Sequence, residues 1–324
     1  MLDRKHLKKM IAIISIGVLS LAFAEFFSGS NPIWYRTGSG YLFVLPIYLT
    51  HSLFYINIAY HRKTFSFKGL YVLGMMFGLY EGLITRVLWV GYPNEDGAIF
   101  GTLLDVAWFE YATLIIFWHP LMALMVPMMI FMMMSGERIE GLSFSKTTLA
   151  AISLVLFGGI FLHAALVSNM RVIIESILVH IIIIIGMMMT IKRLSIQLED
   201  LILSKRSVWI LLGFMVLGVY VPFWFFYDTF TVRPSWLGMI TYLVSWLGII
   251  LFYIKRVKRK PIELIKDEHG SLLAKVIGLG GLMLVWILVL NWFLFLVVPM
   301  SLIMFLALPI FGVVLLVFVS AKLN

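Results

Sequence analysis

The sequence contains no cysteine and few charged residues. The lack of cysteine excludes disulfides, cysteine-ligated zinc or iron–sulfur clusters, and a thiol nucleophile. Charged residues make up 13% of the 324 residues, against about 25% in soluble domains. No polar stretch is long enough for a separate soluble domain, and the longest covers only residues 255–271. We therefore predict a single integral membrane domain over residues 1–324.

Apolar residues dominate what remains, at 62% of the chain with a mean hydropathy of +1.04. They fall into repeated runs of about 20 residues, the length of a transmembrane helix. The predicted fold is all-α, a polytopic transmembrane helical bundle of about ten spans. The predicted spans are 10–28, 41–60, 69–91, 105–134, 147–167, 172–190, 208–227, 235–253, 273–294 and 298–320. The first run ends Ala22-Phe23-Ala24, so a cleaved signal peptide is a competing interpretation of it.

The net charge of +9 is explained by where the basic residues fall on this map. Of 25 Lys and Arg residues, 21 lie in segments placed inside when the N-terminus is cytoplasmic. Cytoplasmic loops of membrane proteins are enriched in Lys and Arg, so we predict cytoplasmic N- and C-termini in a multi-pass protein of the cell membrane. The expected partners are the lipid bilayer and, at basic loops such as 255–260, anionic lipid. No nucleic-acid face is predicted.

Ionisable residues inside apolar spans are the strongest functional signal, above all in residues 69–134. An ionised side chain at membrane depth costs several kcal/mol, so such residues are functional candidates by default. They lie from the predicted midplane outward, which indicates a polar cavity open to the outer face. The predicted substrate-binding or proton-relay residues are Glu81, Arg86, Glu110, His119, Asp105, Glu25, Glu175 and His180.

Depth and helical phase suggest pairs among them. Arg86 and Glu110 lie at similar depth on consecutive antiparallel spans, which predicts an ion pair. Asp105 and His119 are fourteen residues apart and share one face of a straight helix, whereas Glu110 faces the opposite way. Glu81 and His119, both near the midplane, form the predicted reactive or proton-carrying pair.

Glycine and proline mark how these spans pack. Gly74, Gly78 and Gly82 form a row of small residues that allows another helix to approach closely. Pro120 interrupts the fourth span, as does Pro127, and each removes a backbone donor. We expect a kink that aims His119 or frees a carbonyl beside it.

No cofactor or metal is predicted. The sequence has no phosphate-binding or dinucleotide-binding fingerprint. His119, with His180 or His51 and Glu81, would be a possible ligand set, but these residues lie on different helices without metal-ligand spacing.

Three stretches together resemble an uncharacterised family of prokaryotic polytopic membrane proteins, over roughly residues 20–135. They are Glu25-Phe26-Phe27-Ser28-Gly29-Ser30-Asn31-Pro32, Tyr80-Glu81-Gly82-Leu83 with Arg86, and His119 followed by Pro127. Tyr80 stands where that family often has a first glutamate. A more distant resemblance is to CAAX-type intramembrane proteases, in which Glu81 would activate water, His119 would assist, and His180 and Asn291 would stabilise the oxyanion.

Two functions follow. The first is a transporter or permease in which the polar residues bind a small-molecule or lipid substrate or relay protons. The alternative is an intramembrane hydrolase or transferase acting on a lipid or peptide, with Glu81 and His119 as base and acid.

Overall fold

The computed structural model describes residues 3–85, 87–90, 102–139, 169–222, 235–266 and 294–321. Within them, six helices are long and apolar enough to cross a membrane. These are Arg4–Phe26, Gly40–Arg62, Phe67–Thr85, Trp108–Ser135, Arg171–Leu194 and Trp236–Arg256, and a shorter apolar helix covers Leu306–Ala321. The all-α membrane fold is thus confirmed. Predicted spans 147–167 and 273–294 lie almost wholly outside the described residues, so the count of ten and the cytoplasmic termini stay predictions.

The chain forms two compact units, each assembled from three stretches of sequence. Unit 1 comprises Met1–Leu53, Val126–Ile202 and Ile262–Phe305, and unit 2 comprises Phe54–Met125, Leu203–Pro261 and Leu306–Asn324. The division falls inside helix α2 (Leu45–Arg62) and between η4 (Tyr111–Met125) and α6 (Val126–Ser135).

In unit 1, helix α1 (Arg4–Leu21) continues into the π-helical turn η1 (Ala22–Phe26) and packs on α6 and on α8 (Met170–Leu194). Lys8 Nζ donates to the carbonyl of Ser195 (3.0 Å), the residue that ends α8. A lysine side chain at a helix C-terminus can donate to a free carbonyl, and its positive charge interacts favourably with the negative end of the helix dipole. The short helix η5 (Leu198–Leu201) follows, and Lys9 Nζ donates to the carbonyl of Ile202 just beyond it (2.9 Å).

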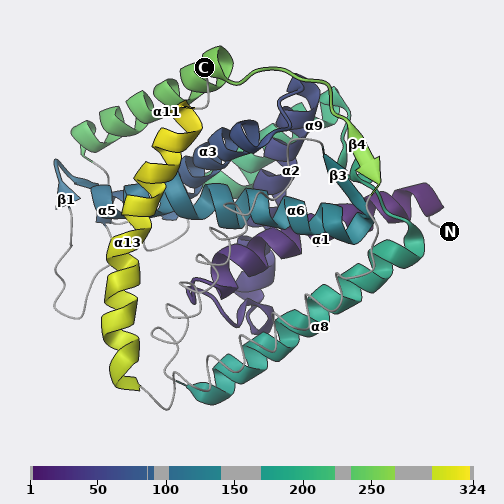
Figure 1. The fold of residues 1–324 in the computed structure, drawn as a ribbon, viewed down its shortest axis with the longest axis horizontal. Coiled ribbons are helices and arrows are strands. Elements are labelled where there is room, and N and C mark those ends of the chain that lie inside the picture. Colours follow the sequence, from purple (N-terminus) through teal and green to yellow (C-terminus); the bar gives the residue numbers. More distant parts are fainter. Residues whose placement is uncertain are drawn as a thin grey trace. The chain divides into compact units, whose positions relative to one another are not determined.

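Four further short elements lie in this unit. Helix η2 (Trp34–Arg36) and the π-helical turn η3 (Gly40–Val44) connect η1 to α2. Strands β3 (Glu137–Ile139) and β4 (Leu264–Lys266) pair antiparallel, as Figure 1 shows. Glu137 Oε2 accepts from the backbone N–H of Leu198 (2.6 Å) and so attaches this ladder to η5.

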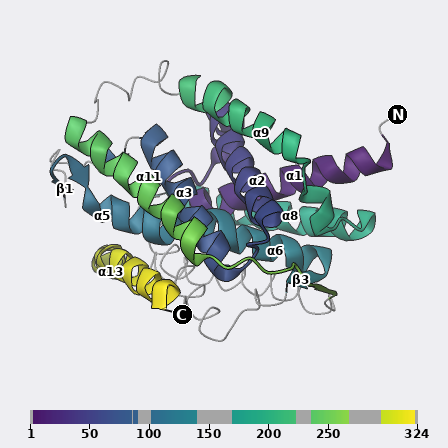
Figure 2. The same ribbon diagram turned by 90° about the horizontal axis from the view of Figure 1, so that it is seen from above.

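In unit 2, helix α3 (Phe67–Thr85) packs along η4, which is entered through the short helix α5 (Trp108–Glu110). Helix α11 (Trp236–Arg256) also contacts α3 (Figure 2). Helix α4 (Val87–Val90) follows α3, and α9 (Lys205–Phe214) continues into η6 (Met215–Tyr220). Helix α13 (Leu294–Ala321) belongs to this unit from Leu306 onward, and its earlier residues belong to unit 1. In α3, 83% of the most apolar stretch is buried, against 17% in α11. The exposed side chains of α11 include Leu243, Val244 and Leu247, which is typical of a lipid-facing helix.

A small hairpin replaces the predicted start of the fourth span. Strands β1 (Thr102–Leu103) and β2 (Val106–Ala107) pair antiparallel. The two residues between them, Leu104 and Asp105, both have positive φ (53° and 56°). Positive φ at both central positions is characteristic of the type I′ turns that close two-residue hairpins. The span therefore begins at Trp108, and the prediction that Asp105 lies on its helix is wrong.

Candidate functional site

Helices α3 and η4 approach each other closely at two glycines. A Cβ added at Gly74 would lie 2.4 Å from Pro120 Cα, and one added at Gly78 would lie 3.1 Å from Ile115 Cα and 3.2 Å from His119 Cβ. Because real Cβ contacts are never as short as the first, only glycine fits at position 74 without movement of the η4 backbone. The predicted close approach at this row is confirmed for Gly74 and Gly78. Gly82 faces Leu88 of the following helix α4 instead.

The predicted proline irregularity is present in η4. This segment is π-helical over fifteen residues, Tyr111–Met125, with Pro120 inside it. Pro120 has no N–H, so in π-helical winding the carbonyl five residues earlier, that of Ile115, lacks its usual donor. The Tyr71 hydroxyl of α3 donates to the next carbonyl oxygen, that of Ile116 (2.6 Å). The side chain of a neighbouring helix thus adds a hydrogen bond beside the point where proline removes one.

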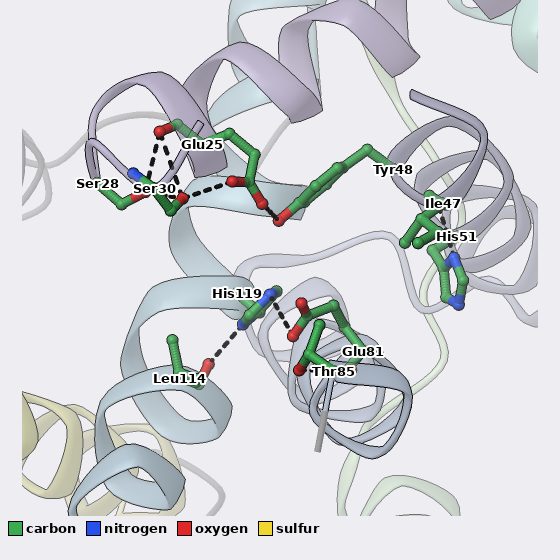
Figure 3. A network of polar contacts seen from close by, with 10 residues as sticks. All are labelled: Glu25, Ser28, Ser30, Ile47, Tyr48, His51, Glu81, Thr85, Leu114 and His119. Carbon is green, nitrogen blue, oxygen red and sulfur yellow. Dashed lines mark hydrogen bonds and ion pairs between the residues drawn. The ribbon is translucent and has the colours of Figure 1, made fainter. Parts of the chain in front are cut away.

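His119, immediately before Pro120, makes two directed contacts (Figure 3). Its Nδ1 lies 3.1 Å from the carbonyl oxygen of Leu114, one turn earlier. A carbonyl only accepts hydrogen bonds, so Nδ1 carries the hydrogen. Its Nε2 lies 3.3 Å from Glu81 Oε2 of α3. The predicted pairing of Glu81 with His119 is therefore present as a contact.

The pair is secluded, since His119 has 3% and Glu81 12% of its side chain exposed. The Phe77 ring lies 5.6 Å from the imidazole, centre to centre. Within the described residues, His119 Nε2 has no hydrogen bond of good geometry, although Glu81 is within ion-pair distance. With Nδ1 fixed by Leu114, Nε2 is the nitrogen that can gain or lose a proton. The arrangement can hold one proton between an imidazole and a carboxylate in an apolar setting.

Of the other predicted residues of spans three and four, Glu110 and Asp105 lie within the described residues. Arg86 lies outside the described residues, so its ion pair with Glu110 stays a prediction. Glu110 is buried, at 2% exposure, where α5 meets η4. The α-helical phase argument that set it opposite His119 does not apply, because π-helical winding differs from α-helical winding. Asp105 is exposed in the hairpin turn.

Glu25 belongs to a separate cluster in unit 1, at the end of η1 (Figure 3). Ser30 Oγ donates to Glu25 Oε2 (2.5 Å), and the Tyr48 hydroxyl of α2 donates to Oε1. Ser28 Oγ lies 3.0 Å from the Glu25 carbonyl oxygen and 2.6 Å from Ser30 Oγ. Ser28 thus contacts the backbone carbonyl of Glu25, Ser30 contacts its carboxylate, and the two hydroxyls contact each other.

Glu175 and His180 of α8 meet helix η2, also in unit 1. Arg36 forms an ion pair with Glu175, and Tyr35 donates to Glu175 Oε1 (3.2 Å). Burial and the nearby Glu175 charge raise the pKa of Tyr35 to about 12, so its hydroxyl remains a donor at neutral pH. Trp34 Nε1 donates to His180 Nε2 (3.1 Å), while His180 Nδ1 lies 2.6 Å from the Ser176 carbonyl. These contacts attach α8 to the segment after the first span.

Sequence reasoning missed several partners in these clusters. From the sequence alone, aromatic residues in or beside apolar spans are expected to pack or to lie at the membrane interface, and this is how Tyr48, Tyr71 and Trp34 would be interpreted. Nothing in their spacing predicts that they form hydrogen bonds. Arg36 appeared only as a loop charge. The succession of a span-ending glutamate and Ser-Gly-Ser was visible as part of the family resemblance, but nothing in it predicted that the serines contact Glu25. Asn291 lies outside the described residues.

The helices and buried polar side chains define an α-helical multi-pass membrane protein. The chain belongs to a family described as an uncharacterised membrane protein family, whose model matches residues 14–323. The family expected from residues 20–135 is thus confirmed over nearly the whole chain. An uncharacterised protein of Archaeoglobus fulgidus is 34% identical over 122 residues, which are 38% of this chain and 38% of that protein. No solved structure matches the chain.

Proposed function

We propose that this protein is a transporter that moves a small molecule or lipid across the membrane and uses Glu81 and His119 to exchange protons. The observation that carries the proposal is the contact between His119 Nε2 and Glu81 Oε2 at 3.3 Å, inside two apolar helices. Ionisable residues kept at such positions are costly to stability and mark ion or proton pathways in transport proteins. The contact places a proton acceptor and donor within one transfer step of each other.

The irregular helix supports the same proposal. Secondary transporters commonly bind substrate and coupling ions where a transmembrane helix is interrupted near its middle. Here the interruption is the π-helical stretch with Pro120, and His119 stands directly before that proline. Irregular backbone of this kind offers carbonyl groups and can change its winding, which α-helical segments resist.

In this proposal Glu110 and Arg86 line the path between the Glu81–His119 pair and the outer face. The cavity opens outward because the predicted topology places the ionisable residues from the midplane toward that face. The localisation is the cell membrane, and the basic loops lie in the cytoplasm beside anionic lipid.

The absence of cysteine allows a direct test of alternating access. Thr85 lies one helical turn after Glu81, and its hydroxyl donates to the Glu81 carbonyl (3.1 Å). A Thr85→Cys variant carries a single thiol, which an impermeant maleimide can reach in right-side-out or inverted vesicles. If the protein is a transporter, Thr85→Cys should be labelled from both faces of the membrane. The ratio of labelling from the two faces should change in Glu81→Gln and stay the same in Glu199→Gln, which alters an exposed carboxylate. Labelling from one face only, unaffected by Glu81→Gln, would contradict transport.

A second candidate function is an intramembrane hydrolase or transferase. The observation in its favour is the contact of His119 Nδ1 with the Leu114 carbonyl, since a further group that orients the acid–base histidine is a common feature of enzymes. Glu81 would then act as base and His119 as acid. Proteoliposomes analysed by mass spectrometry would show turnover of a lipid or an added peptide that is lost in Glu81→Gln. One-sided Thr85→Cys labelling combined with such turnover would favour the enzyme.

A further inference from the structure

The strongest unassigned site is the oxygen cluster at the end of the first long helix. Glu25 contributes its carbonyl oxygen and Oε2, and Ser28 and Ser30 contribute their hydroxyl oxygens. Gly29, with a φ of 75°, turns the chain back so that both serines face Glu25. We propose that these four oxygens bind a sodium ion. The proposal concerns unit 1 alone and does not depend on transport or on the Glu81–His119 pair.

The cluster has three close oxygen–oxygen contacts but only two hydroxyl hydrogens to place in them. Three close contacts join Ser28 Oγ to the Glu25 carbonyl (3.0 Å), Ser28 Oγ to Ser30 Oγ (2.6 Å) and Ser30 Oγ to Glu25 Oε2 (2.5 Å). Carbonyl and carboxylate oxygens only accept, so the two serine hydroxyls must supply every hydrogen, and they carry one each. One contact therefore brings two oxygens together with no hydrogen between them. A bound cation, or a proton on Glu25, removes that deficit.

The electrostatic setting of Glu25 favours a cation. None of the ion pairs among the described residues includes Glu25, whose carboxylate contacts hydroxyl groups there. Its backbone carbonyl also accepts from the Asn31 N–H (3.4 Å). The neighbouring Phe23, Phe26 and Phe27 are buried and apolar, and a carboxylate charge in such surroundings is costly without a positive partner. The cluster also sits at the C-terminal end of a continuous helix, Arg4–Phe26. This is the negative end of the helix dipole, which attracts cations.

The donor atoms select the type of cation. The set contains only oxygen, from one carboxylate, one backbone carbonyl and two hydroxyls, which suits hard cations rather than transition metals. Divalent Ca²⁺ takes six to eight oxygen ligands and usually several carboxylates, whereas one carboxylate balances a single positive charge. Carbonyls at helix C-terminal ends hold Na⁺ in many transporters. Ser30 is exposed, so the ion has access from solution.

Tyr48 has a different part in this cluster. Its hydroxyl donates to Glu25 Oε1, the oxygen that does not face the serines. It thereby holds the carboxylate in place while Oε2 remains directed at Ser30. Tyr48→Phe removes this contact without removing any of the four proposed ligand oxygens, and Ser28→Ala with Ser30→Ala removes two of them.

The test is the thermal stability of the purified full-length protein in detergent. A ligand that binds only the folded state raises the Tm. We expect the wild-type Tm to be about 2–4 °C higher in sodium chloride than in choline chloride of equal concentration. Potassium chloride should give a smaller shift. The sodium shift should persist in Ser39→Ala, an exposed serine of the same segment, and it should disappear in the Ser28→Ala/Ser30→Ala double variant.

Direct binding of radioactive ²²Na⁺ to the same samples tests the proposal even if a variant is too unstable for Tm measurements. Wild-type protein should bind it and release it to excess unlabelled NaCl but not to choline chloride, and Glu25→Gln should bind at least tenfold less tightly. Equal Tm values in sodium and choline together with no ²²Na⁺ binding would show that a proton on Glu25 completes the cluster, and would overturn the proposal. A sodium shift that survives in the double serine variant would also overturn it.

Discussion

Gly74 of α3 lies directly against Pro120 of η4, where an added Cβ would be 2.4 Å from the proline Cα. One turn along α3, Gly78 lies against Ile115 and His119. The residue that breaks η4 and the residues that allow α3 to approach it therefore meet at one place. Glu81 follows Gly78 by three positions and so lies on the same side of α3. The packing of the two helices thus determines the distance between Glu81 and His119.

Gly78→Leu should lower stability, because the new side chain has to enter the space held by Ile115 and His119. Overpacking of this kind costs about 1–3 kcal/mol or more, which corresponds to a fall in Tm of about 2–10 °C. Gly248→Leu in α11 is the matched control, since nothing lies within 4 Å of a Cβ added there. Thermal unfolding in detergent measures both. Equal Tm values for the two variants would show that the glycine row is not a packing surface.

Tyr71→Phe should destabilise the protein without changing its fold. The substitution removes only the hydroxyl that donates to the Ile116 carbonyl. Loss of one partly buried hydrogen bond costs about 0.5–1.5 kcal/mol, so the Tm should fall by a few degrees. Tyr41→Phe is the control, because the Tyr41 hydroxyl also donates to a backbone carbonyl, that of Tyr35 (2.8 Å), but in an exposed position. An unchanged Tm for Tyr71→Phe would mean that another group satisfies this carbonyl.

The predicted topology can be tested with the same cysteine-free background. Single cysteines at Ser271 and Asn94 should be labelled from opposite faces, Ser271→Cys from the cytoplasm and Asn94→Cys from outside. The expectation rests on the basic residues, 21 of 25 of which fall on one side of the map. An impermeant maleimide added to intact cells measures it. Labelling of Ser271→Cys from outside would show that the predicted topology is wrong.

The sequence was informative where a local pattern has one structural meaning. The small-residue row predicted that another helix approaches the third span closely, without identifying which one. His119 before Pro120 predicted an irregular point in the fourth span, because proline acts on the backbone whatever surrounds it. Because the number of residues from the helix ends placed Glu81 and His119 near the same membrane depth, the sequence also predicted that they form a pair.

Patterns failed where the outcome depends on tertiary contacts or on the winding of a helix. Asp105 was placed on a helix because the apolar run continues through it, but two positive-φ residues close a hairpin there instead. The phase of Glu110 was calculated for an α-helix, and η4 is π-helical. The contact of Tyr48 with Glu25 joins residues 23 positions apart, and no periodicity marks such a pair.

The site prediction compares four variants, in which function and stability should separate. Glu81→Gln keeps the shape and the hydrogen-bonding capacity of Glu81 but removes its titratable proton, so it should leave a folded and inactive protein, and His119→Ala should likewise lose activity. Glu110 is buried, and its predicted partner is Arg86. If the pair is structural, Glu110→Ala and Arg86→Ala each leave one buried charge unpaired and cost about 3–5 kcal/mol, and the double substitution recovers part of the loss.

The reason for the difference is that a group kept for function inside a membrane is a burden on stability, whereas a paired structural group is not. Removing the charge of Glu81 should therefore leave the Tm unchanged or slightly higher, while removing that of Glu110 should lower it sharply. Thermal unfolding in detergent gives the stability, and two-sided labelling of Thr85→Cys in each background gives the function. Glu199→Gln, an exposed carboxylate, controls for loss of charge alone. If Glu81→Gln unfolds the protein, or labels as the wild type does, the Glu81–His119 pair is structural and both proposed functions lose their central residue.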